Sequence, residues 1–483
     1  MKICIRNICC IGAGYVGGPT MAVIADYCPN IKVAVVDVNK NRIDLWNSKD
    51  LDDLPIYEPG LKKIIERCRG KNLFFSTSIN EYIESADMVF ISVNTPTKKT
   101  GIGAGKASDL KWVEASARQV AKFSKGNTIV VEKSTLPVKT AEVIKEILES
   151  TDPIQKVKEQ KSFHVLSNPE FLAEGSAIND LQKPDRILIG GESKDAIMAL
   201  HEIYRNWVPE EKILHTNIWS SELAKLTANA FLAQRISSIN SIGALCEATG
   251  ADVREVARAI GSDKRIGSRF LDSGPGFGGS CFKKDILNLV YLSNHFGLPE
   301  VANFWESVVS LNNWNQNRLS TLIVKTLFGT VSSKKICILG FSFKANTNDT
   351  RDSAALNICK NLLEEGAYLI IHDPKVGSKQ IELDLNLKPV IESEDVEYES
   401  DPSQYEGKWS YSREVYKACN RADAIVVLTE WEMYSDLNWE IVAKSMRSPA
   451  WVFDSRSIVN SKKVLKAKLN FWRVGDGAIQ KKR

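Results

Sequence analysis

Hydrophobic and polar positions show two different periodicities along the chain. Through the first third, short β-branched runs alternate with helical patterns, which is typical of a parallel sheet wrapped by helices. Strands are predicted there at residues 8–11, 33–38, 88–93, 129–132, 164–167 and 186–189. The alternation resumes after Ser332, with strands predicted at residues 336–340, 368–372, 424–428 and 451–454. The pattern therefore predicts two doubly wound α/β parts.

Between these parts the apolar residues recur at helical spacing. Residues 220–249 carry such a stripe, formed by Leu223, Leu226, Ala230, Ala233, Ile236 and Ile239. Gly250 stands where a helix C-cap is expected, and helical patterns continue through residues 285–317. We therefore expect two doubly wound, Rossmann-like α/β domains joined by a long central helix and an all-helical middle region. The expected divisions are residues 1–216, 217–328 and 329–483.

Composition excludes several classes of protein. The 483 residues exceed what one core usually organises, and 43% apolar with 25% charged residues is ordinary for a globular protein. A formal charge of +4, without a basic stripe, predicts no nucleic-acid partner. We expect no signal peptide, and no apolar stretch approaches the roughly 20 residues that span a bilayer, so no membrane partner is expected. Ten scattered cysteines predict a reducing compartment, the cytoplasm, and no metal site.

A glycine-rich loop follows the first predicted strand. A glycine at its first position permits a tight turn, at its second lets the backbone approach a pyrophosphate, and at its third lets the helix pack on the strand. By itself this pattern can be a mere tight turn. Asp37, however, lies 20 residues after Gly17, where a carboxylate would bind a ribose 2′-hydroxyl. Together they predict a dinucleotide site, formed by Gly12, Ala13, Gly14, Tyr15, Val16, Gly17 and Asp37.

Asp37 favours NAD over NADP as the cofactor. A carboxylate at Asp37 would repel the 2′-phosphate of NADP, so we expect NAD. Arg42 is the competing observation, because an arginine five residues further on can accept that phosphate.

Two segments rich in Asn, Pro, Ser and Thr follow the third and fourth predicted strands, at the edge where α/β sheets bind ligands. They comprise Val93, Asn94, Thr95, Pro96, Thr97, Ser134 and Thr135. From the pattern alone, ordinary turn chemistry is the better interpretation.

A second glycine loop precedes a cysteine. Residues 276–279 hold three glycines, which allow a close backbone approach to a ligand, and Cys281 would sit at that ligand's edge. Asp285 lies four residues further on, so a helix would carry both on one face. A buried structural cysteine is the commoner alternative, and it stays open here.

Lys225 and Asn229 are also four residues apart, on one face of the predicted long helix. The small and apolar neighbours of Lys225 suggest a functional lysine. Most helix lysines, however, are solvated, and the pattern alone favours that alternative.

Taken together, these motifs resemble the UDP-glucose/GDP-mannose dehydrogenase family, particularly its animal-type enzymes that oxidise UDP-glucose. The resemblance spans nearly the whole chain in the family's order. It is carried by residues 12–17, 57–60, 94–97, 132–135, 168–175, 225–229, 276–285 and 340–344.

The resemblance implies an NAD-dependent, two-step oxidation of UDP-glucose to UDP-glucuronate, a glycosaminoglycan precursor, through a cysteine thiohemiacetal and thioester. Cys281 would be the nucleophile, Lys225 and Asp285 would handle a water and its proton, and Asn229 would lie beside them. Thr135 and Glu170 match residues that hold this water. Among the cofactor contacts, Glu174 matches a residue near the nicotinamide, and Arg351 matches a contact that crosses between subunits.

For the sugar nucleotide, the resemblance implies a contact set drawn from several segments. The matching residues are Glu170, Phe171, Leu172, Ala173, Glu174, Lys225, Asn229, Phe270, Phe277, Gly278, Phe343, Lys344 and Arg456. Arg265 matches a residue that reaches the substrate of a neighbouring subunit. We therefore expect a homo-oligomer built on dimers, with a hexamer as the expected assembly, although spacing alone does not give the number of subunits.

One departure and several alternatives remain. In the string formed by residues 454–457, Ser455 stands where the family usually has glycine before the arginine, which weakens the transfer to Arg456. Lys344 would act as a point charge for a phosphate, although a purely structural last domain fits its pattern equally well. GDP-mannose or UDP-N-acetylmannosamine oxidation, or an inactive NAD- and nucleotide-binding protein, are the competing functions.

Overall fold

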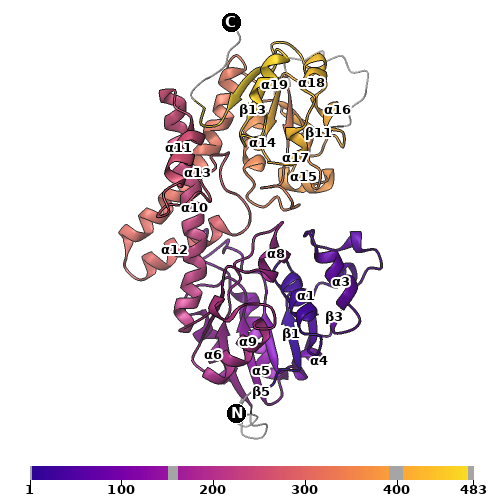
Figure 1. The fold of residues 1–483 in the computed structure, drawn as a ribbon, viewed down its shortest axis with the longest axis vertical. Helices are drawn as coiled ribbons and strands as arrows, with labels where there is room; N and C mark the ends of the chain where they lie inside the picture. The colour runs from indigo at the N-terminus through magenta and orange to yellow at the C-terminus, as the bar shows by residue number, and fades with distance from the viewer. Residues whose placement is uncertain (1–2, 151–160, 391–405, 477–483) are drawn as a thin grey trace. The chain divides into compact units, whose positions relative to one another are not determined.

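The computed structural model describes residues 3–150, 161–390 and 406–476 (Figure 1). The chain divides into two compact units. One comprises Met1–Ala228 and Leu287–Ala302, and the other comprises Asn229–Ile286 and Asn303–Arg483. Within the described residues, no helix combines the length and apolar character needed to cross a membrane.

An eight-stranded sheet forms the centre of the first unit, in the order β3-β2-β1-β4-β5-β6-β7-β8. All neighbouring strands are parallel except β6 and β7. Its first six strands follow the 3-2-1-4-5-6 order of dinucleotide-binding folds. The strands are β1 (Asn7–Ile11), β2 (Lys32–Val36), β3 (Leu73–Ser76), β4 (Met88–Ile91), β5 (Asn127–Glu132), β6 (Ser162–Ser167), β7 (Ile187–Gly191) and β8 (Ile213–Thr216).

Helices cover both faces of this sheet. Ile8 and Cys10 of β1 belong to one apolar cluster, whereas Cys9 and Ile11 belong to another, because successive strand residues point to opposite faces. The first cluster includes residues of α1 (Gly17–Tyr27), α3 (Leu61–Cys68), α8 (Ala177–Gln182) and α9 (Lys194–Tyr204). The second includes α4 (Ile79–Glu84), α5 (Lys111–Phe123) and α6 (Thr140–Glu149). Burial on both faces explains the continuous apolar strands in the sequence. The remaining short elements are α2 (Lys40–Trp46), η1 (Leu51–Asp53) and η2 (Glu210–Lys212).

The predicted long helix is confirmed. It is α10 (Ile218–Thr249), 32 residues long, and it ends at Gly250, whose φ of 84° is the left-handed conformation of a glycine C-cap. The helical region continues through α11 (Val253–Gly261), α12 (Phe282–His295) and α13 (Pro299–Thr326).

The second unit holds a six-stranded, wholly parallel sheet in the order β11-β10-β9-β12-β13-β14. In chain order this is again 3-2-1-4-5-6, so two doubly wound sheets are confirmed. The strands are β9 (Lys335–Leu339), β10 (Tyr368–His372), β11 (Lys408–Tyr411), β12 (Ala424–Val427), β13 (Trp451–Asp454) and β14 (Asn470–Arg473). The helices are α14 (Ala354–Glu364), α15 (Ser378–Leu385), α16 (Val415–Cys419), α17 (Glu432–Ser435), α18 (Trp439–Ser445) and α19 (Ser461–Lys466).

Sequence patterns missed four strands, and all four are sheet edges: β3, β8, β11 and β14. An edge strand has one neighbour and tolerates polar residues, so its apolar signal is weak. The second predicted strand also ends two residues early, at Val36, because Asp37 turns its side chain to backbone N–H groups.

Candidate active site

The three loop glycines meet three different surroundings. Gly12 has a φ of 111°, and a Cβ on it would collide with the Ser92 carbonyl oxygen. A Cβ on Gly17, the first residue of α1, would collide with the Gly12 carbonyl oxygen. A Cβ on Gly14 would meet nothing within 4 Å. The first and third glycines are therefore required by the fold, and the second leaves open space for a ligand at the start of α1.

Asp37 holds this loop from the end of β2. Its Oδ2 accepts the Ala13 N–H at 2.9 Å and its Oδ1 accepts the Asn39 N–H at 2.9 Å. The Arg42 guanidinium lies 3.6 Å from Oδ2, so its charge is directed at Asp37. This ion pair opposes the alternative in which Arg42 attracts a 2′-phosphate.

The loops after β4 and β5 are tied together. The Ser134 hydroxyl donates to the Val93 carbonyl at 2.7 Å, and the Thr95 hydroxyl donates to the Thr135 carbonyl at 3.1 Å. The segments at residues 93–97 and 134–135 therefore form one rim at the carboxyl edge of the sheet, joined through Val93, Thr95, Ser134 and Thr135. These bonds are more than the local turn chemistry that the sequence pattern favoured.

A buried ion pair lies beside this rim. Glu170 follows β6, and its Oε1 lies 3.2 Å from Lys225 Nζ and 3.4 Å from the Thr135 hydroxyl. The two charged side chains are only about one-twentieth exposed, which contradicts the solvated alternative for Lys225. Glu170 Oε2 is buried without a hydrogen-bond partner in the described chain. A buried carboxylate oxygen of this kind is a place for an ordered water.

Aromatic and acidic neighbours fix the segment that carries Glu170. The Phe171 ring contacts two cations, with the Arg186 guanidinium 3.7 Å and Lys225 Nζ 5.5 Å from its centroid. The buried Glu58 carboxylate accepts the Gly175 N–H at 2.7 Å and the Ala177 N–H at 3.1 Å. Sequence reasoning gave Glu58 no role. The sequence pointed to Glu58 only because residues 57–60 are one of the segments that carry the family resemblance.

The remaining residues of this segment are less constrained. Leu172 packs partly buried against the first apolar cluster, and the Ala173 N–H donates to Asp180 at 3.0 Å. Glu174 is half-buried on the same turn before α8.

Cys281 lies directly before α12. Its carbonyl oxygen accepts the Asp285 N–H at 2.9 Å, which is the first hydrogen bond of the helix, and its thiol lies 3.6 Å from the Ser280 hydroxyl. Eight of the ten cysteines are buried, whereas Cys281 and Cys4 are exposed. Exposure contradicts the structural alternative for Cys281. A helix N-terminus also stabilises negative charge beside it.

Asp285 is almost fully buried in the same unit. Asn229 Nδ2 donates to its Oδ2 at 2.6 Å, and Lys284 Nζ lies 3.3 Å from its Oδ1. Both carboxylate oxygens therefore have donors, and the orientation of the group is fixed.

The second glycine loop packs on the last domain. A Cβ on Gly278 would lie 2.5 Å from the Asp352 carbonyl oxygen, and one on Gly279 would lie 3.1 Å from the Phe343 ring. The Gly279 N–H donates to the Arg351 carbonyl at 2.8 Å. These glycines therefore let two backbone segments approach, with Phe277 buried behind them.

Arg456 joins this group despite the unusual sequence before it. Its Nη2 donates to the Phe343 carbonyl at 2.9 Å and its Nε to the Leu428 carbonyl at 2.8 Å. Asp454, two residues before Arg456, is buried and accepts the N–H groups of Arg456 and Val459. Lys344 Nζ lies 5.6 Å from the centroid of the Phe343 ring.

Two predicted residues, Arg265 and Phe270, lie apart from these contacts, and a third, Arg351, joins them through its backbone carbonyl. Arg265 pairs with Asp263 at 2.6 Å and its side chain is 89% exposed. Arg351 pairs with Asp349 at 2.7 Å. Phe270 is exposed with a φ of 61°.

The predicted catalytic residues thus form two groups. Glu170, Thr135 and Lys225 belong to the first unit, and Cys281, Asp285 and Asn229 belong to the second. α10 carries a member of each group, with Lys225 and Asn229 four residues apart.

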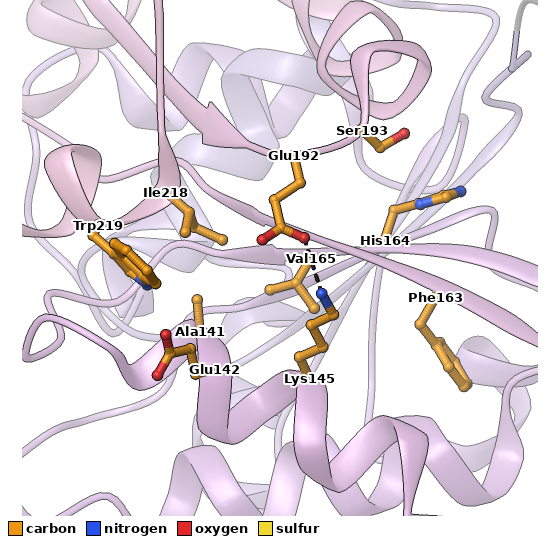
Figure 2. Close-up of a pocket in the computed structure, with 10 residues that line it drawn as sticks. All are labelled: Ala141, Glu142, Lys145, Phe163, His164, Val165, Glu192, Ser193, Ile218 and Trp219. Carbon is orange, nitrogen blue, oxygen red and sulfur yellow. Dashed lines mark hydrogen bonds and ion pairs between the residues drawn. The ribbon is translucent and has the colours of Figure 1, made fainter.

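A separate pocket of about 410 Å³ lies between α6 and the β6–β7 region (Figure 2). Figure 2 shows Lys145 directed at Glu192, and the two groups are 2.9 Å apart. Trp219 lies to one side of this pair, and His164 and Phe163 lie to the other. None of the predicted site residues lines it.

The comparisons with known proteins agree across the chain. Three profiles of the UDP-glucose/GDP-mannose dehydrogenase family match in order: the NAD binding domain at residues 6–208, the central domain at residues 219–314 and the UDP binding domain at residues 337–461.

Relatives are similar over nearly their whole length. UDP-glucose 6-dehydrogenase of Gallus gallus is 56% identical, over 94% of this chain and 90% of the relative. UDP-glucose 6-dehydrogenase 4 of Arabidopsis thaliana is 53% identical, over 95% and 94%. The solved UDP-glucose dehydrogenase of Pyrobaculum islandicum has a TM-score of 0.80 and 29% identity, over 98% of both chains. The chain therefore belongs to the UDP-glucose/GDP-mannose dehydrogenase family.

Proposed function

We propose that this protein oxidises UDP-glucose to UDP-glucuronate in two NAD-dependent steps through a covalent intermediate on Cys281. The observation that carries the proposal is the exposed thiol before α12, followed by an Asp285 carboxylate that Asn229 orients. The substrate is inferred from relatives that are named UDP-glucose 6-dehydrogenase and are more than half identical.

NAD is the cofactor, and when bound it takes up the hydride that leaves the sugar carbon. The open space at Gly14, the N-terminus of α1 and the Asp37 carboxylate suit its pyrophosphate and adenine ribose. The rim at Val93, Asn94, Thr95, Pro96, Thr97, Ser134 and Thr135 is assigned to the rest of the cofactor. Glu174 and Arg351 are assigned as further contacts.

The chemistry assigned to Cys281 balances in three stages. After the first hydride leaves C6 and a proton leaves the hydroxyl oxygen on it, the thiolate adds to the resulting aldehyde carbon and a C–S bond forms. Loss of a second hydride from that carbon gives a thioester. Water then adds, the C–S bond breaks, and the thiolate leaves the carboxylate product.

Lys225 and Glu170 act on the two oxygen atoms of the reaction, that of C6 and that of the hydrolytic water. Lys225 is a buried cation that stabilises the negative charge developing on the C6 oxygen. Glu170, through its unpartnered Oε2, and Thr135 hold the hydrolytic water. Asp285, with Asn229 beside it, accepts a proton from the hydroxyl or the water.

The sugar nucleotide is assigned to the second glycine loop and the last domain. Phe277, Gly278, Phe343, Lys344 and Arg456 lie on segments that contact one another in the second unit. Lys344 and Arg456 supply positive charge for the diphosphate. Residues 1–216, 217–328 and 329–483 are the proposed NAD-binding, dimerisation and UDP-sugar-binding domains.

The assembly is proposed to be built on dimers, with a hexamer as the complete form. On α10, Phe231 is 56% and Leu245 is 59% exposed, and apolar side chains of this size favour a protein interface. The exposed Arg265 would reach a neighbouring subunit. We propose a cytoplasmic location, which the scattered cysteines favour.

One assay tests the activity. The protein is mixed with NAD and, separately, UDP-glucose, GDP-mannose and UDP-N-acetylmannosamine, and NADH absorbance is followed. UDP-glucose is expected to give the highest kcat/KM. The third substrate is included because UDP-D-ManNAc dehydrogenase of Pyrococcus horikoshii has a TM-score of 0.77 and 25% identity to this chain. A higher kcat/KM for another sugar nucleotide would contradict the substrate, and no turnover with any would favour a binding protein.

A further inference from the structure

Lys133 is a buried lysine for which the proposed mechanism has no use. It directly follows β5, two residues before Thr135, and its side chain is only 2% exposed. Lysines are almost never fully buried unless paired, because the charged form loses its hydration. In the described chain, however, no carboxylate lies within ion-pair distance of its ammonium group. Lys133 therefore carries a buried charge that local ion pairing does not explain.

Its hydrogen bonds are all to neutral groups. Lys133 Nζ donates to Asn168 Oδ1 at 3.1 Å and to the Tyr204 hydroxyl at 3.3 Å. The Tyr204 hydroxyl donates to the same Asn168 oxygen at 2.6 Å, and Asn168 Nδ2 donates to the Leu188 carbonyl at 2.7 Å. Asn168 would therefore keep a donor if the lysine were removed. Packing and hydrogen bonding alone do not require a cation here.

The charges around Lys133 belong to the proposed active site. Burial lowers the pKa of Lys133 to about 8, the negative charge of Glu170 raises it, and the positive charge of Lys225 lowers it. The Cys10 thiol and the Tyr204 hydroxyl also face the ammonium group, but burial raises the pKa of each, so both stay neutral. Glu170 is thus the one anion, and Lys225 the one other cation, that act on Lys133 in the described chain.

We propose that Lys133 is a positioning residue, whose buried positive charge attracts the Glu170 carboxylate in its contact with Lys225 and whose hydrogen bond orients Asn168, two residues before Glu170. This inference rests on the proposed function, because Glu170 is the residue assigned to hold the hydrolytic water. Lys133 itself need not touch the substrate.

The charge count gives the role its physical basis. The single negative charge of Glu170 is attracted by two buried lysines, and the local field is net positive. A positive field also stabilises the oxyanion that forms when water adds to the thioester. When Lys133 loses its proton, near pH 8, both effects weaken. Hydrolysis should therefore slow above that pH.

The first experiment compares Lys133→Met with the wild-type protein, using NAD and UDP-glucose. Lys133→Met is expected to lower kcat at least about tenfold, with KM changed less than about twofold. The melting temperature at pH 7 should stay at or above the wild-type value, because a buried charge is removed. The decline in kcat above pH 8 should disappear. Lys212→Met is the matched control: the Lys212 ammonium group donates to the Pro184 carbonyl, and the kcat of this variant should be unchanged.

A purely structural lysine would behave in the opposite way. Lys133→Met would then lower the melting temperature and leave the kcat of the folded fraction and its pH profile unaltered. That result would overturn the proposal.

A second measurement needs neither turnover nor a stable Lys133→Met protein. The titration of Lys133 is followed by NMR in ¹³C-lysine-labelled protein, with its resonance assigned through Lys133→Arg. Glu170→Gln should lower the pKa of Lys133, and Lys225→Met should raise it, each by at least about half a pH unit. If neither variant moves this pKa, the proposed relationship is wrong. Absence of UDP-glucose turnover by wild-type protein would instead refute the proposed function, and the titration would still decide the charge relationship.

Discussion

Asn229 on α10 donates a 2.6 Å hydrogen bond from its side-chain amide to the carboxylate of Asp285 on α12. The two residues are 56 positions apart in the chain, and both are buried. The opposite carboxylate oxygen faces Lys284 at 3.3 Å. A carboxylate held in this way keeps one orientation and has its remaining lone pairs available for a proton or a water.

Removal of this charge should affect turnover more than binding. Asp285→Asn keeps the shape of the side chain but removes its basicity, so kcat should fall by roughly a hundredfold or more. The affinity for NAD should change less than about twofold, since the cofactor loop belongs to the other unit. Steady-state kinetics and calorimetric NAD titration measure both quantities. Near-normal kcat would show that Asp285 is not the proton acceptor.

The loop glycines predict a contrast between two similar substitutions. Gly12→Ala should lower stability by roughly 2 to 4 kcal/mol, because the residue has a φ of 111° and its Cβ would collide with Ser92. Gly14→Ala should have the melting temperature of the wild-type protein, since its Cβ meets nothing within 4 Å. Its affinity for NAD should nevertheless fall at least about tenfold, because the added methyl group fills the space of the pyrophosphate. Thermal unfolding and NAD titration separate the two. Equal NAD affinity of Gly14→Ala and wild type would exclude this loop as the phosphate site.

Cofactor choice should depend on Asp37. Asp37→Asn removes the charge that repels a 2′-phosphate and weakens the ribose hydrogen bond, so KM for NAD should rise roughly tenfold while NADP becomes a better substrate. The substitution also frees Arg42 from its ion pair at 3.6 Å. The ratio of kcat/KM for the two cofactors is the measurement. An unchanged ratio would mean that another residue sets the preference.

Stability should depend on pH through Lys133. The pKa of Lys133 is about 8 in the folded protein, whereas an unperturbed lysine in the unfolded chain has a pKa of 10.5. The unfolded chain therefore binds the proton more tightly. The contribution of this group is therefore most favourable above pH 10.5, and it is lost as the pH falls towards 8. At neutral pH the buried charge costs about 3 kcal/mol. The melting temperature of Lys133→Met relative to wild type should thus be highest below pH 8 and decline above it, which scanning calorimetry measures. A pH-independent difference would contradict the shifted pKa.

The sequence predicted what local pattern determines. Central strands are buried on both faces, so β1, β9 and β12 stand out as apolar runs. The three glycines of the first loop were recognisable because a tight turn, an approach to a pyrophosphate and helix packing each require a residue without a side chain. The edge strands β3, β8, β11 and β14 were missed because one neighbour imposes a weaker pattern.

Contacts between distant residues could not be predicted in the same way. Lys133 and Tyr204 are 71 positions apart, and Glu58 lies 117 positions from the Gly175 N–H that it binds. Nothing in the local sequence shows that Lys133 is buried or that Lys225 meets Glu170. Family resemblance indicated the catalytic residues, whereas the structure was needed to find the residues that support them.

The central claim is that Cys281 carries the intermediate, and the stoichiometry of Cys281→Ser tests it most directly. Wild-type protein should form two NADH for each UDP-glucose consumed, because a four-electron oxidation requires two hydride transfers. Cys281→Ser should bind NAD and UDP-glucose nearly as well but release little UDP-glucuronate, since a serine hydroxyl is a far weaker nucleophile and its ester hydrolyses more slowly. NADH absorbance and product quantification on one preparation give the ratio. Two NADH per UDP-glucose at near-normal rate from the folded variant would show that Cys281 is not the nucleophile.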